Sequence, residues 1–561
     1  MANGDNPSTN PVSDDNDSRG QNPIHHARHL KVICIGAGAS GLLLAYKLQR
    51  SFENFELVIY EKNDAVSGTW YENKYPGCAC DIPAHIYTWT FEPNPDWSSV
   101  YAGSDEIFQY FERFADKYNL RQYVKLQHLV SKAVWNAKAG NWEVEVVDTK
   151  DGTIINDTCD ILVNGTGVLN AWKWPDIPGL DKFKGKLLHT ARWDRSVDLD
   201  GKHVGLIGNG SSAIQVLPSI YDKVSKITSF IRSPTWVTPV QGVTARKYTN
   251  EERQKYAAHP DTLLQYRKEL ESGLNSMFAM VFADSPTQNA VKADFTALMK
   301  GRLQDERLEN LVIPKWGVAC RRLTPGVGYL EALRAEKTEV VYGPIERISF
   351  DTSYKPRFPI IGSTGQSLSD AWAEECRSYF GLAAPGFPNY FVFIGPNSPI
   401  GNGPVLVGVE AQADYMLKMM NRWQTENIKS FTPKDAAVEE FIEFKDRFME
   451  PTVWNEDCRS WYKNNSVTGK VTALWPGSTL HYLEALAEPR YEDWDFTYTG
   501  NRFAYLGNGC SQAESDRTAD WAYYIRNQDD GPYLSRNKLI KALIKSGTVV
   551  RSGEAEAKAA I

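Results

Sequence analysis

The chain has 561 residues, of which 42% are hydrophobic and 23% are charged, and its formal net charge is −7. One hydrophobic core rarely serves so long a chain, so we expect two or three domains. The mild acidity excludes the basic surface that is typical of nucleic-acid-binding proteins. No apolar run in the sequence approaches the roughly 18 residues that a membrane span requires, so we expect no association with a membrane.

The eight cysteines show no C-x-x-C spacing and no accompanying histidine cluster, so we predict no metal site. A reduced chain in the cytoplasm is the expectation that follows. Residues 1–29 are rich in Asn, Asp and Ser and lack an apolar stretch. This composition predicts a disordered N-terminal tail and is unlike that of a signal peptide.

A complete βαβ pattern occupies residues 31–61: a strand, a glycine-rich turn, a helix and a second strand. The turn reads GAGASG and contains Gly36, Gly38 and Gly41. These glycines allow a tight turn and a close approach to a pyrophosphate, which would sit on the N-terminus of the helix. Glu61, at the end of the second strand, is placed to accept hydrogen bonds from a ribose 2′-hydroxyl. The pattern therefore predicts a dinucleotide with free ribose hydroxyls.

The same pattern returns at residues 202–232, and alanine takes the place of the third glycine, as the fingerprint allows. Its turn supplies the candidate cofactor contacts Gly208, Gly210, Ser211 and Ser212. Arg232 stands where Glu61 stands in the first pattern. An arginine cannot accept from a hydroxyl but pairs with a 2′-phosphate, which predicts NADP here. The alternative is a solvated surface arginine.

Two dinucleotide folds with opposite ribose preferences predict FAD in the first and NADPH in the second, with hydride passing from nicotinamide to flavin. The predicted fold class is α/β, with two Rossmann-like dinucleotide-binding domains. Polar, helical composition at about 245–312 predicts a helical insert in the NADP domain. After the tail, we expect a first part of the FAD-binding domain at 30–170, a linker and NADP-binding domain at 171–380, and a second part of the FAD-binding domain with the C-terminal region at 381–561.

Two longer motifs carry a resemblance to a known family. The stretch FKGKLLHTARWD matches the fingerprint F-x-G-x-x-x-H-T-x-x-W-P/D at every fixed position, namely Phe183, Gly185, His189, Thr190, Trp193 and Asp194. The residues from Gly68 to Asp81 match G-x-W-x-x-x-x-[FY]-P-G-x-x-x-D. The chain thus resembles the flavin-dependent Baeyer–Villiger monooxygenases, which include cyclohexanone, phenylacetone and 4-hydroxyacetophenone monooxygenases.

The resemblance implies a mechanism and two catalytic residues. NADPH reduces FAD, O2 adds to the flavin as a C4a-peroxide, and the peroxide attacks a small-molecule ketone through a tetrahedral adduct to give an ester or lactone. Arg322 is the implied catalytic cation, and Asp81 is the acid that pairs with it. Arg321 is implied to lie nearer the NADP 2′-phosphate, although the register of the two arginines stays open by one residue. Arginine suits the role because it stays charged and donates several hydrogen bonds.

The resemblance also implies contacts with the cofactors. These involve Gly68, Thr69, Trp70, Asp81, Tyr87 and Trp461. Trp70 is expected to pack against the flavin, and Trp461 to reach the nicotinamide or the substrate. His189 lies in the linker between the two folds, so we expect it to fasten the linker rather than to act as a base. The oligomeric state is not indicated.

Two alternatives remain. A related flavin enzyme could oxygenate a sulfide or an amine instead of a ketone. The second alternative arises from a departure from the family pattern, whose strand ending in A-T-G should follow the predicted strands at 340–342 and 345–349. These run directly into 350–354, with no A-T-G between them. A central parallel strand is buried on both faces, so its loss would predict a catalytically impaired member.

Overall fold

The computed structural model describes residues 22–168, 172, 174, 180–239, 243–343 and 354–525. Two compact units divide the chain: Ala27–Tyr505, and the remainder formed by both ends. Of the predicted disordered tail, residues 1–21 lie outside the described residues. Arg28, in contrast, belongs to the larger unit, where its Nε donates to the carbonyl oxygen of Trp423 at 3.0 Å.

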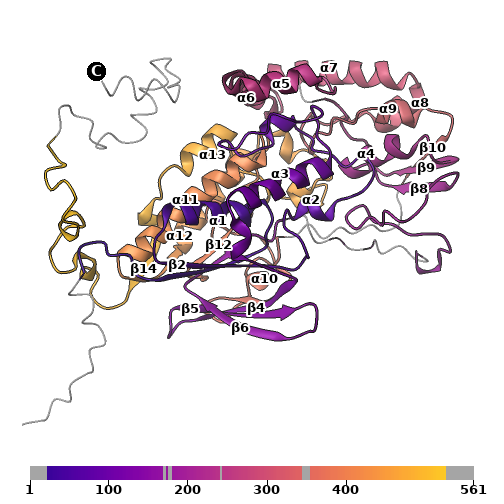
Figure 1. Cartoon of the computed structure of the whole chain (residues 1–561). Coiled ribbons are helices and arrows are strands. Elements are labelled where there is room, and N and C mark those ends of the chain that lie inside the picture. The colour runs from indigo at the N-terminus through magenta and orange to yellow at the C-terminus, as the bar shows by residue number, and fades with distance from the viewer. Residues whose placement is uncertain are drawn as a thin grey trace, which may run out of the picture. The chain divides into compact units, whose positions relative to one another are not determined.

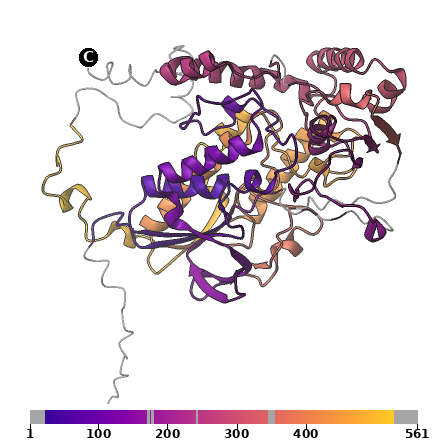
Figure 2. The same cartoon turned by 45° about the vertical axis from the view of Figure 1, so that its right-hand side comes forward.

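A parallel five-stranded sheet forms the first dinucleotide fold, in the strand order β12-β7-β1-β2-β3. Its strands are β1 (Leu30–Ile35), β2 (Phe55–Glu61), β3 (Val124–Leu126), β7 (Ile161–Asn164) and β12 (Tyr390–Val392). Helices α1 (Ala39–Ser51) and α11 (Val405–Thr425) cover one face. The other face packs on a smaller sheet (Figures 1 and 2). Burial on both faces explains why β1 and β7 are nearly all apolar.

The smaller sheet is antiparallel except for one short edge strand, in the order β11-β4-β5-β6. It contains β4 (His128–Asn136), β5 (Asn141–Asp148), β6 (Ile154–Cys159) and β11 (Ile360–Ile361). Alternate residues of its strands, including Val144 and Val146, point into the core shared with β1 and β7. This alternation is what a sheet with one buried face produces.

The second dinucleotide fold is a parallel sheet whose described strands follow the order β10-β9-β8. The strands are β8 (His203–Ile207), β9 (Lys226–Ile231) and β10 (Thr338–Tyr342), and α4 (Ser211–Ile220) follows the glycine turn. Between β9 and β10 lie α5 (Asn250–Ala258), α6 (Pro260–Ser276), α7 (Pro286–Leu303), α8 (Glu306–Val312) and α9 (Tyr329–Leu333). The predicted fold class, with two Rossmann-like domains and a helical insert, is confirmed.

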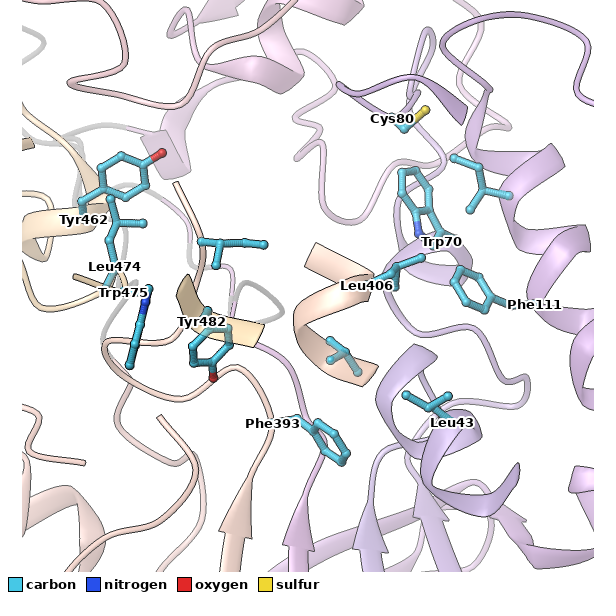
Figure 3. Packing of buried hydrophobic residues seen from close by; sticks show 14 of the residues in the cluster. Leu43, Trp70, Cys80, Phe111, Phe393, Leu406, Tyr462, Leu474, Trp475 and Tyr482 are labelled. Carbon is cyan, nitrogen blue, oxygen red and sulfur yellow. The ribbon is translucent and has the colours of Figure 1, made fainter. Parts of the chain in front are cut away.

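The remaining elements complete the core beside the first fold. They are α2 (Thr69–Glu72), α3 (Ser104–Lys117), α10 (Leu368–Ala371), α12 (Asp435–Met449), α13 (Thr479–Ala485) and the antiparallel pair β13 (Ile428–Pro433) and β14 (Trp494–Tyr498). Figure 3 shows part of this core, with Leu43 of α1, Phe111 of α3 and Leu406 of α11. The same cluster contains Trp475 and Tyr482, so the C-terminal segments pack directly onto the first fold.

The strand that leads into each glycine turn is central in one fold and at an edge in the other. β1 is flanked by β2 and β7, whereas β8 pairs only with β9 within the described residues. The last residue of β8, Ile207, is 42% exposed. An edge position at β8 is what the absence of the A-T-G strand would leave, although the predicted strand at 345–349 lies outside the described residues.

The cysteines correct one prediction. All eight lie in the described residues, and Cys320 and Cys458 form a disulfide with a Cα–Cα distance of 6.4 Å. The other six are free. The prediction of a fully reduced chain is therefore wrong, because a pairing across 138 residues leaves no local spacing signal.

None of the helices in the described residues is long and apolar enough to cross a bilayer. No group of three or more His, Cys, Asp or Glu side chains within these residues could hold a metal ion. The cytoplasmic location stays a prediction.

Because one edge of β8 is unpaired in the described sheet, its amides should exchange with solvent faster than those of β9, which is flanked on both sides. We expect a difference of at least about tenfold between peptides from these two strands in hydrogen–deuterium exchange followed by mass spectrometry. Equal protection of β8 and β9 would mean that a further segment pairs with β8 in solution.

Candidate functional site

The first glycine turn has a conformation that only glycine adopts readily. Gly36 has a φ of +101°, and a Cβ there would lie 2.8 Å from the carbonyl oxygen of Gly165. A Cβ on Gly41 would lie 2.1 Å from the carbonyl oxygen of Gly36. The third glycine therefore lets α1 pack closely on β1. Gly38 caps α1 without a side-chain hydrogen bond, so the first N–H groups of the helix are available to an anion.

Glu61 is held rigidly beside this turn. It is only 4% exposed, its Oε2 accepts from the backbone N–H of Ala37 at 2.8 Å, and its Oε1 accepts from that of Asn63 at 2.9 Å. Burial raises the pKa of the carboxyl above its usual value, and the two backbone hydrogen bonds oppose this effect. The carboxylate is therefore oriented by the turn itself. Its predicted contact with a ribose hydroxyl stays a prediction.

The second turn leaves open space where a ligand would approach. Gly208 has a φ of +96°, and a Cβ added to Gly210 would meet nothing within 4 Å. Gly210 caps α4 with no side-chain hydrogen bond. Ser211 and Ser212 begin the helix, and the hydroxyl of Ser211 bonds to that of Thr324 at 2.7 Å.

The paired arginines point to different neighbours. Arg321 turns toward the end of β9, where its Nη1 donates to the Ser233 hydroxyl at 3.2 Å and to the Pro234 carbonyl at 3.0 Å. These residues directly follow Arg232, so the arginines that were predicted for the 2′-phosphate lie together. Burial, followed by the positive charges of Arg232 and Arg459, lowers the pKa of Arg321. We did not predict a role for Arg459.

Arg322 and Asp81 form a bidentate ion pair. The Nε of Arg322 donates to Oδ2 of Asp81 at 2.6 Å, and its Nη2 donates to Oδ1 at 2.8 Å. Burial favours the neutral carboxyl, but the charge and hydrogen bonds of Arg322 hold the pKa of Asp81 below its usual value. The Asp81 charge raises the pKa of Arg322. The guanidinium is 43% exposed, and its Nη1 has no hydrogen-bond partner among the described residues. A fixed cation thus keeps a donor available.

Aromatic side chains lie close to this pair. The indole N–H of Trp70 donates to the Tyr87 hydroxyl at 3.2 Å, and their ring centroids are 5.4 Å apart. Burial raises the pKa of Tyr87. The charge of Asp81 also raises it, and the charge of Arg322 lowers it. The ring of Trp461 meets that of Tyr462 edge-on at 4.8 Å. The charges of Arg322 and Asp81 also act on the pKa of Tyr462, which Arg322 lowers and Asp81 raises. Tyr462 was not predicted as a site residue.

Two observations fit a flavin cofactor in the first fold. The loop before α2 faces the glycine turn, because a Cβ on Gly68, next to Thr69, would lie 3.1 Å from the Cα of Gly38. Asn397 is fully buried, yet neither polar atom of its side chain has a partner among the described residues. Buried amides nearly always have partners, so a group outside the chain is expected to satisfy this one. FAD offers such acceptors and donors.

Gln215, on α4, joins the two folds and was not predicted from the sequence. Its Oε1 accepts from the Tyr75 hydroxyl at 2.9 Å, and its Nε2 donates to the Ala79 carbonyl at 3.0 Å. Ser211, Gln215 and Ser219 recur at four-residue intervals, so they share one face of α4. This polar stripe is the sequence pattern from which a contact of α4 with another segment could have been predicted. It lies against the loop of the second family signature.

His189 of the linker fingerprint contacts two tryptophans that precede the fingerprint in the chain. The His189 ring stacks on Trp172 at 4.7 Å between centroids and meets Trp174 edge-on at 5.7 Å. Its Nδ1 accepts from the Ala191 backbone N–H at 3.1 Å, and burial lowers its pKa. The same segment contains the other fingerprint residues, namely Phe183, Gly185, Thr190, Trp193 and Asp194. These contacts agree with the predicted role of His189 in holding the linker in place. That role stays a prediction.

Asp194 and Trp193 end the fingerprint in different environments. The Asp194 carboxylate accepts from the backbone N–H of Ser196 at 2.9 Å and from its hydroxyl at 2.6 Å, which closes a turn. Trp193 helps to line a cavity of about 900 Å³ that also contacts Tyr75 and Ser219. The linker therefore runs along the junction between the second signature and α4.

Comparison with known proteins connects this architecture to monooxygenases. The profile described as NAD(P)-binding Rossmann-like domain matches residues 34–103. The FAD-binding monooxygenase tazF of Aspergillus terreus is 42% identical over 533 residues, which cover 89% of this chain and 95% of that relative. A Baeyer–Villiger monooxygenase of Streptomyces coelicolor is 33% identical over 518 residues, which cover 88% of this chain and 96% of the relative.

Solved structures share the fold at lower identity. OTEMO in complex with FAD and NADP has a TM-score of 0.72 at 23% identity and covers 83% of this chain and 99% of its own. Cyclohexanone monooxygenase from Rhodococcus sp. Phi1 bound to NADP+ has a TM-score of 0.71 at 23% identity, with 84% and 100% coverage. At this identity the likeness shows the fold alone.

Gly77→Ala should destabilise the junction. A Cβ there would lie 2.1 Å from the Ser219 hydroxyl and 2.5 Å from the backbone oxygen of Gln215, and the φ of +77° is strained for alanine. We expect a cost of about 1–3 kcal/mol, measured as a lower midpoint of thermal unfolding. The matched control is Gly273→Ala in α6, where a Cβ meets nothing within 4 Å and alanine favours the helix. An unchanged midpoint for Gly77→Ala would contradict this packing.

Proposed function

Because the chain belongs to the family of FAD-binding Baeyer–Villiger monooxygenases, we propose that it uses NADPH and O2 to convert a ketone into an ester or lactone. The observation that carries the proposal is the bidentate pair of Arg322 and Asp81, which fixes a cation near the partly buried Tyr87 and the buried Tyr462. Carbonyl oxygenation develops negative charge on the substrate oxygen, and a preorganised cation stabilises that charge.

FAD and NADP are the cofactors of the reaction. When bound, the flavin accepts hydride from NADPH and activates O2. The residues that would hold FAD are Gly36, Gly38, Gly41, Glu61, Gly68, Thr69, Trp70 and Asn397. The N–H groups at the start of α1 would bind the pyrophosphate, and Glu61 would accept from a ribose hydroxyl. OTEMO, which shares the fold, binds FAD and NADP in its solved structure, and this supports FAD as a cofactor of this chain.

The second fold would bind NADP through its turn and two arginines. Gly208, Gly210, Ser211 and Ser212 leave the start of α4 open to a pyrophosphate. Arg232 and Arg321 would pair with the 2′-phosphate, for which the planar guanidinium is well suited. Trp461 would contact the nicotinamide or the ketone, at the edge of Tyr462.

Arg322 would act on the reacting atoms through its available Nη1. Asp81 binds the opposite edge of the guanidinium, so it orients Arg322 and keeps it charged. The ketone oxygen would then meet a donor that needs no reorganisation during the reaction. His189 would hold the linker while the NADP domain shifts between its reducing and oxygenating positions.

The two alternative functions that the sequence left open predict different experimental results. A sulfide or amine oxygenase of the same architecture would oxidise a thioether and leave a ketone unchanged. A member impaired by the lost strand would bind FAD poorly and would consume NADPH without uptake of O2 that depends on the substrate. The substrate is therefore proposed only as a ketone, with O2 as co-substrate.

A panel of cyclic, linear and aromatic ketones, together with one thioether, tests this function. We expect NADPH oxidation that rises on addition of a ketone, with an ester or lactone identified by mass spectrometry. The purified protein should also contain about one FAD per chain. Oxidation of the thioether alone would support the heteroatom alternative, and absence of tightly held FAD would support the impaired one.

Arg322→Ala should lower product formation by at least roughly 10²-fold, because one transition-state donor is lost. FAD content, measured by absorbance, should not change. The control is Arg113→Ala, which removes an exposed arginine on α3 and should leave turnover unaltered. Near-normal lactone formation by Arg322→Ala would rule out the catalytic role of this residue.

A further inference from the structure

Three guanidinium groups gather beside the second dinucleotide fold, and one of them has no part in the function proposed above. Arg232 follows β9, and Arg321 bonds to Ser233 and Pro234, the two residues after it. The third group belongs to Arg459. Burial has the largest effect on the pKa values of Arg232 and Arg321 and lowers both. The positive charge of Arg459 lowers both pKa values further.

None of the described carboxylates balances this positive charge. No carboxylate pairs with Arg232, Arg321 or Arg459 in the part of the chain that the structure describes. The Nη1 of Arg459 donates to the Asn465 carbonyl oxygen at 2.7 Å, which is a neutral acceptor. Arg322, only one residue beyond Arg321, is by contrast neutralised by Asp81. Like charges held together repel one another, so an anion bound between them would stabilise the cluster.

The position of the cluster indicates which anion would bind. Arg232 stands at the end of the second strand of the fold, where dinucleotide-binding folds meet the adenosine ribose. The side chain of Arg459 is exposed, so a ligand can approach it from solvent. A phosphate group on the ribose offers several acceptor oxygens to planar guanidinium forks.

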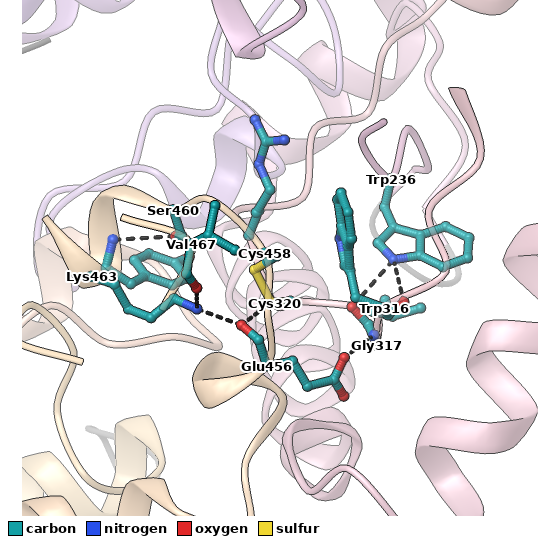
Figure 4. The surroundings of a disulfide bond; sticks show 12 residues. Trp236, Trp316, Gly317, Cys320, Glu456, Cys458, Ser460, Lys463 and Val467 are labelled. Carbon is teal, nitrogen blue, oxygen red and sulfur yellow. Dashed lines mark hydrogen bonds between the residues drawn. A yellow bond between two sulfur atoms is a disulfide. The ribbon is translucent and has the colours of Figure 1, made fainter. Parts of the chain in front are cut away.

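Arg459 comes from a distant segment that the disulfide joins to the cluster. Cys458 bonds to Cys320, so each cysteine directly precedes an arginine of the cluster. Both cysteines are fully buried. A second contact lies nearby, where the backbone N–H of Gly317 donates to the Glu456 carboxylate at 2.6 Å (Figure 4). The two segments are therefore joined at two points, one of them covalent.

We propose that Arg459 is a third cation for the 2′-phosphate of NADP, and that the Cys320–Cys458 disulfide is the positioning element that keeps it beside Arg321. The inference rests on the proposed function only for the identity of the ligand. It makes Arg459 a determinant of the preference for NADP over NAD. The disulfide acts through Arg459 and does not touch the ligand.

Equilibrium binding measures this role without turnover. NADP+, NAD+ and adenosine 2′,5′-bisphosphate are titrated into the purified FAD-containing protein by calorimetry. Arg459→Gln should raise the Kd of NADP+ and of the bisphosphate by roughly tenfold or more and leave that of NAD+ unchanged, because a charged hydrogen bond to phosphate is lost. Arg459→Lys should recover part of the affinity. Arg113→Gln, on the exposed face of α3, is the control.

The disulfide is tested with the double variant Cys320→Ala and Cys458→Ala, since burial shields the bond from added reductant. Its Kd for NADP+ should rise while that for NAD+ does not, and Cys510→Ala, which removes a free cysteine, should change neither. Thiol titration of the unfolded, unreduced protein should detect the six free cysteines. Eight reactive thiols, or unchanged NADP+ affinity in the double variant, would overturn the positioning role.

Loss of NAD+ and NADP+ affinity in equal measure by Arg459→Gln would overturn the role of Arg459, because it would reveal a general disturbance of the fold. Unchanged NADP+ affinity would overturn it as well. A protein that binds the bisphosphate through Arg459 but forms no ester or lactone would contradict the proposed function and still support this inference.

Discussion

The ion pair between Arg322 and Asp81 is the contact on which the arrangement of the site depends. Asp81 ends the loop of the second family signature, and Arg322 follows the helical insert of the other fold. A partly exposed ion pair contributes little to the free energy of unfolding. Its effect is orientation, because two parallel hydrogen bonds fix the plane of the guanidinium. The pair holds a cation at the junction, with one edge bound and the other edge available.

The rest of the junction keeps this geometry in place. Gln215 bonds to the loop that ends at Asp81, and Gly77 in the same loop permits contact with α4. The Cys320–Cys458 disulfide anchors the segment that carries Arg322 from the other side. Neither the loop nor the arginine segment belongs to a sheet. Their positions therefore depend on contacts between the folds.

The two folds show how one backbone pattern serves two ligands. Each has a glycine turn between a strand and a helix, with φ values of +101° at Gly36 and +96° at Gly208. The charge at the end of the second strand differs. Glu61 is fixed by backbone N–H groups of its own turn, whereas Arg232 meets other positive charges. We propose that the charge of this side chain and its electrostatic surroundings set the ribose preference of each fold.

The sequence by itself determined the two βαβ units at 31–61 and 202–232, and the pairing of Asp81 with Arg322 through the family resemblance. Such features are local, since a strand, a turn and a helix leave their periodicity within about thirty residues. Only the tertiary structure decided the disulfide, the contacts of Gln215 and the nearness of Arg459 to Arg321. These join segments up to 140 residues apart. Contacts at that separation arise from packing between surfaces, and no spacing along the chain records which surfaces meet.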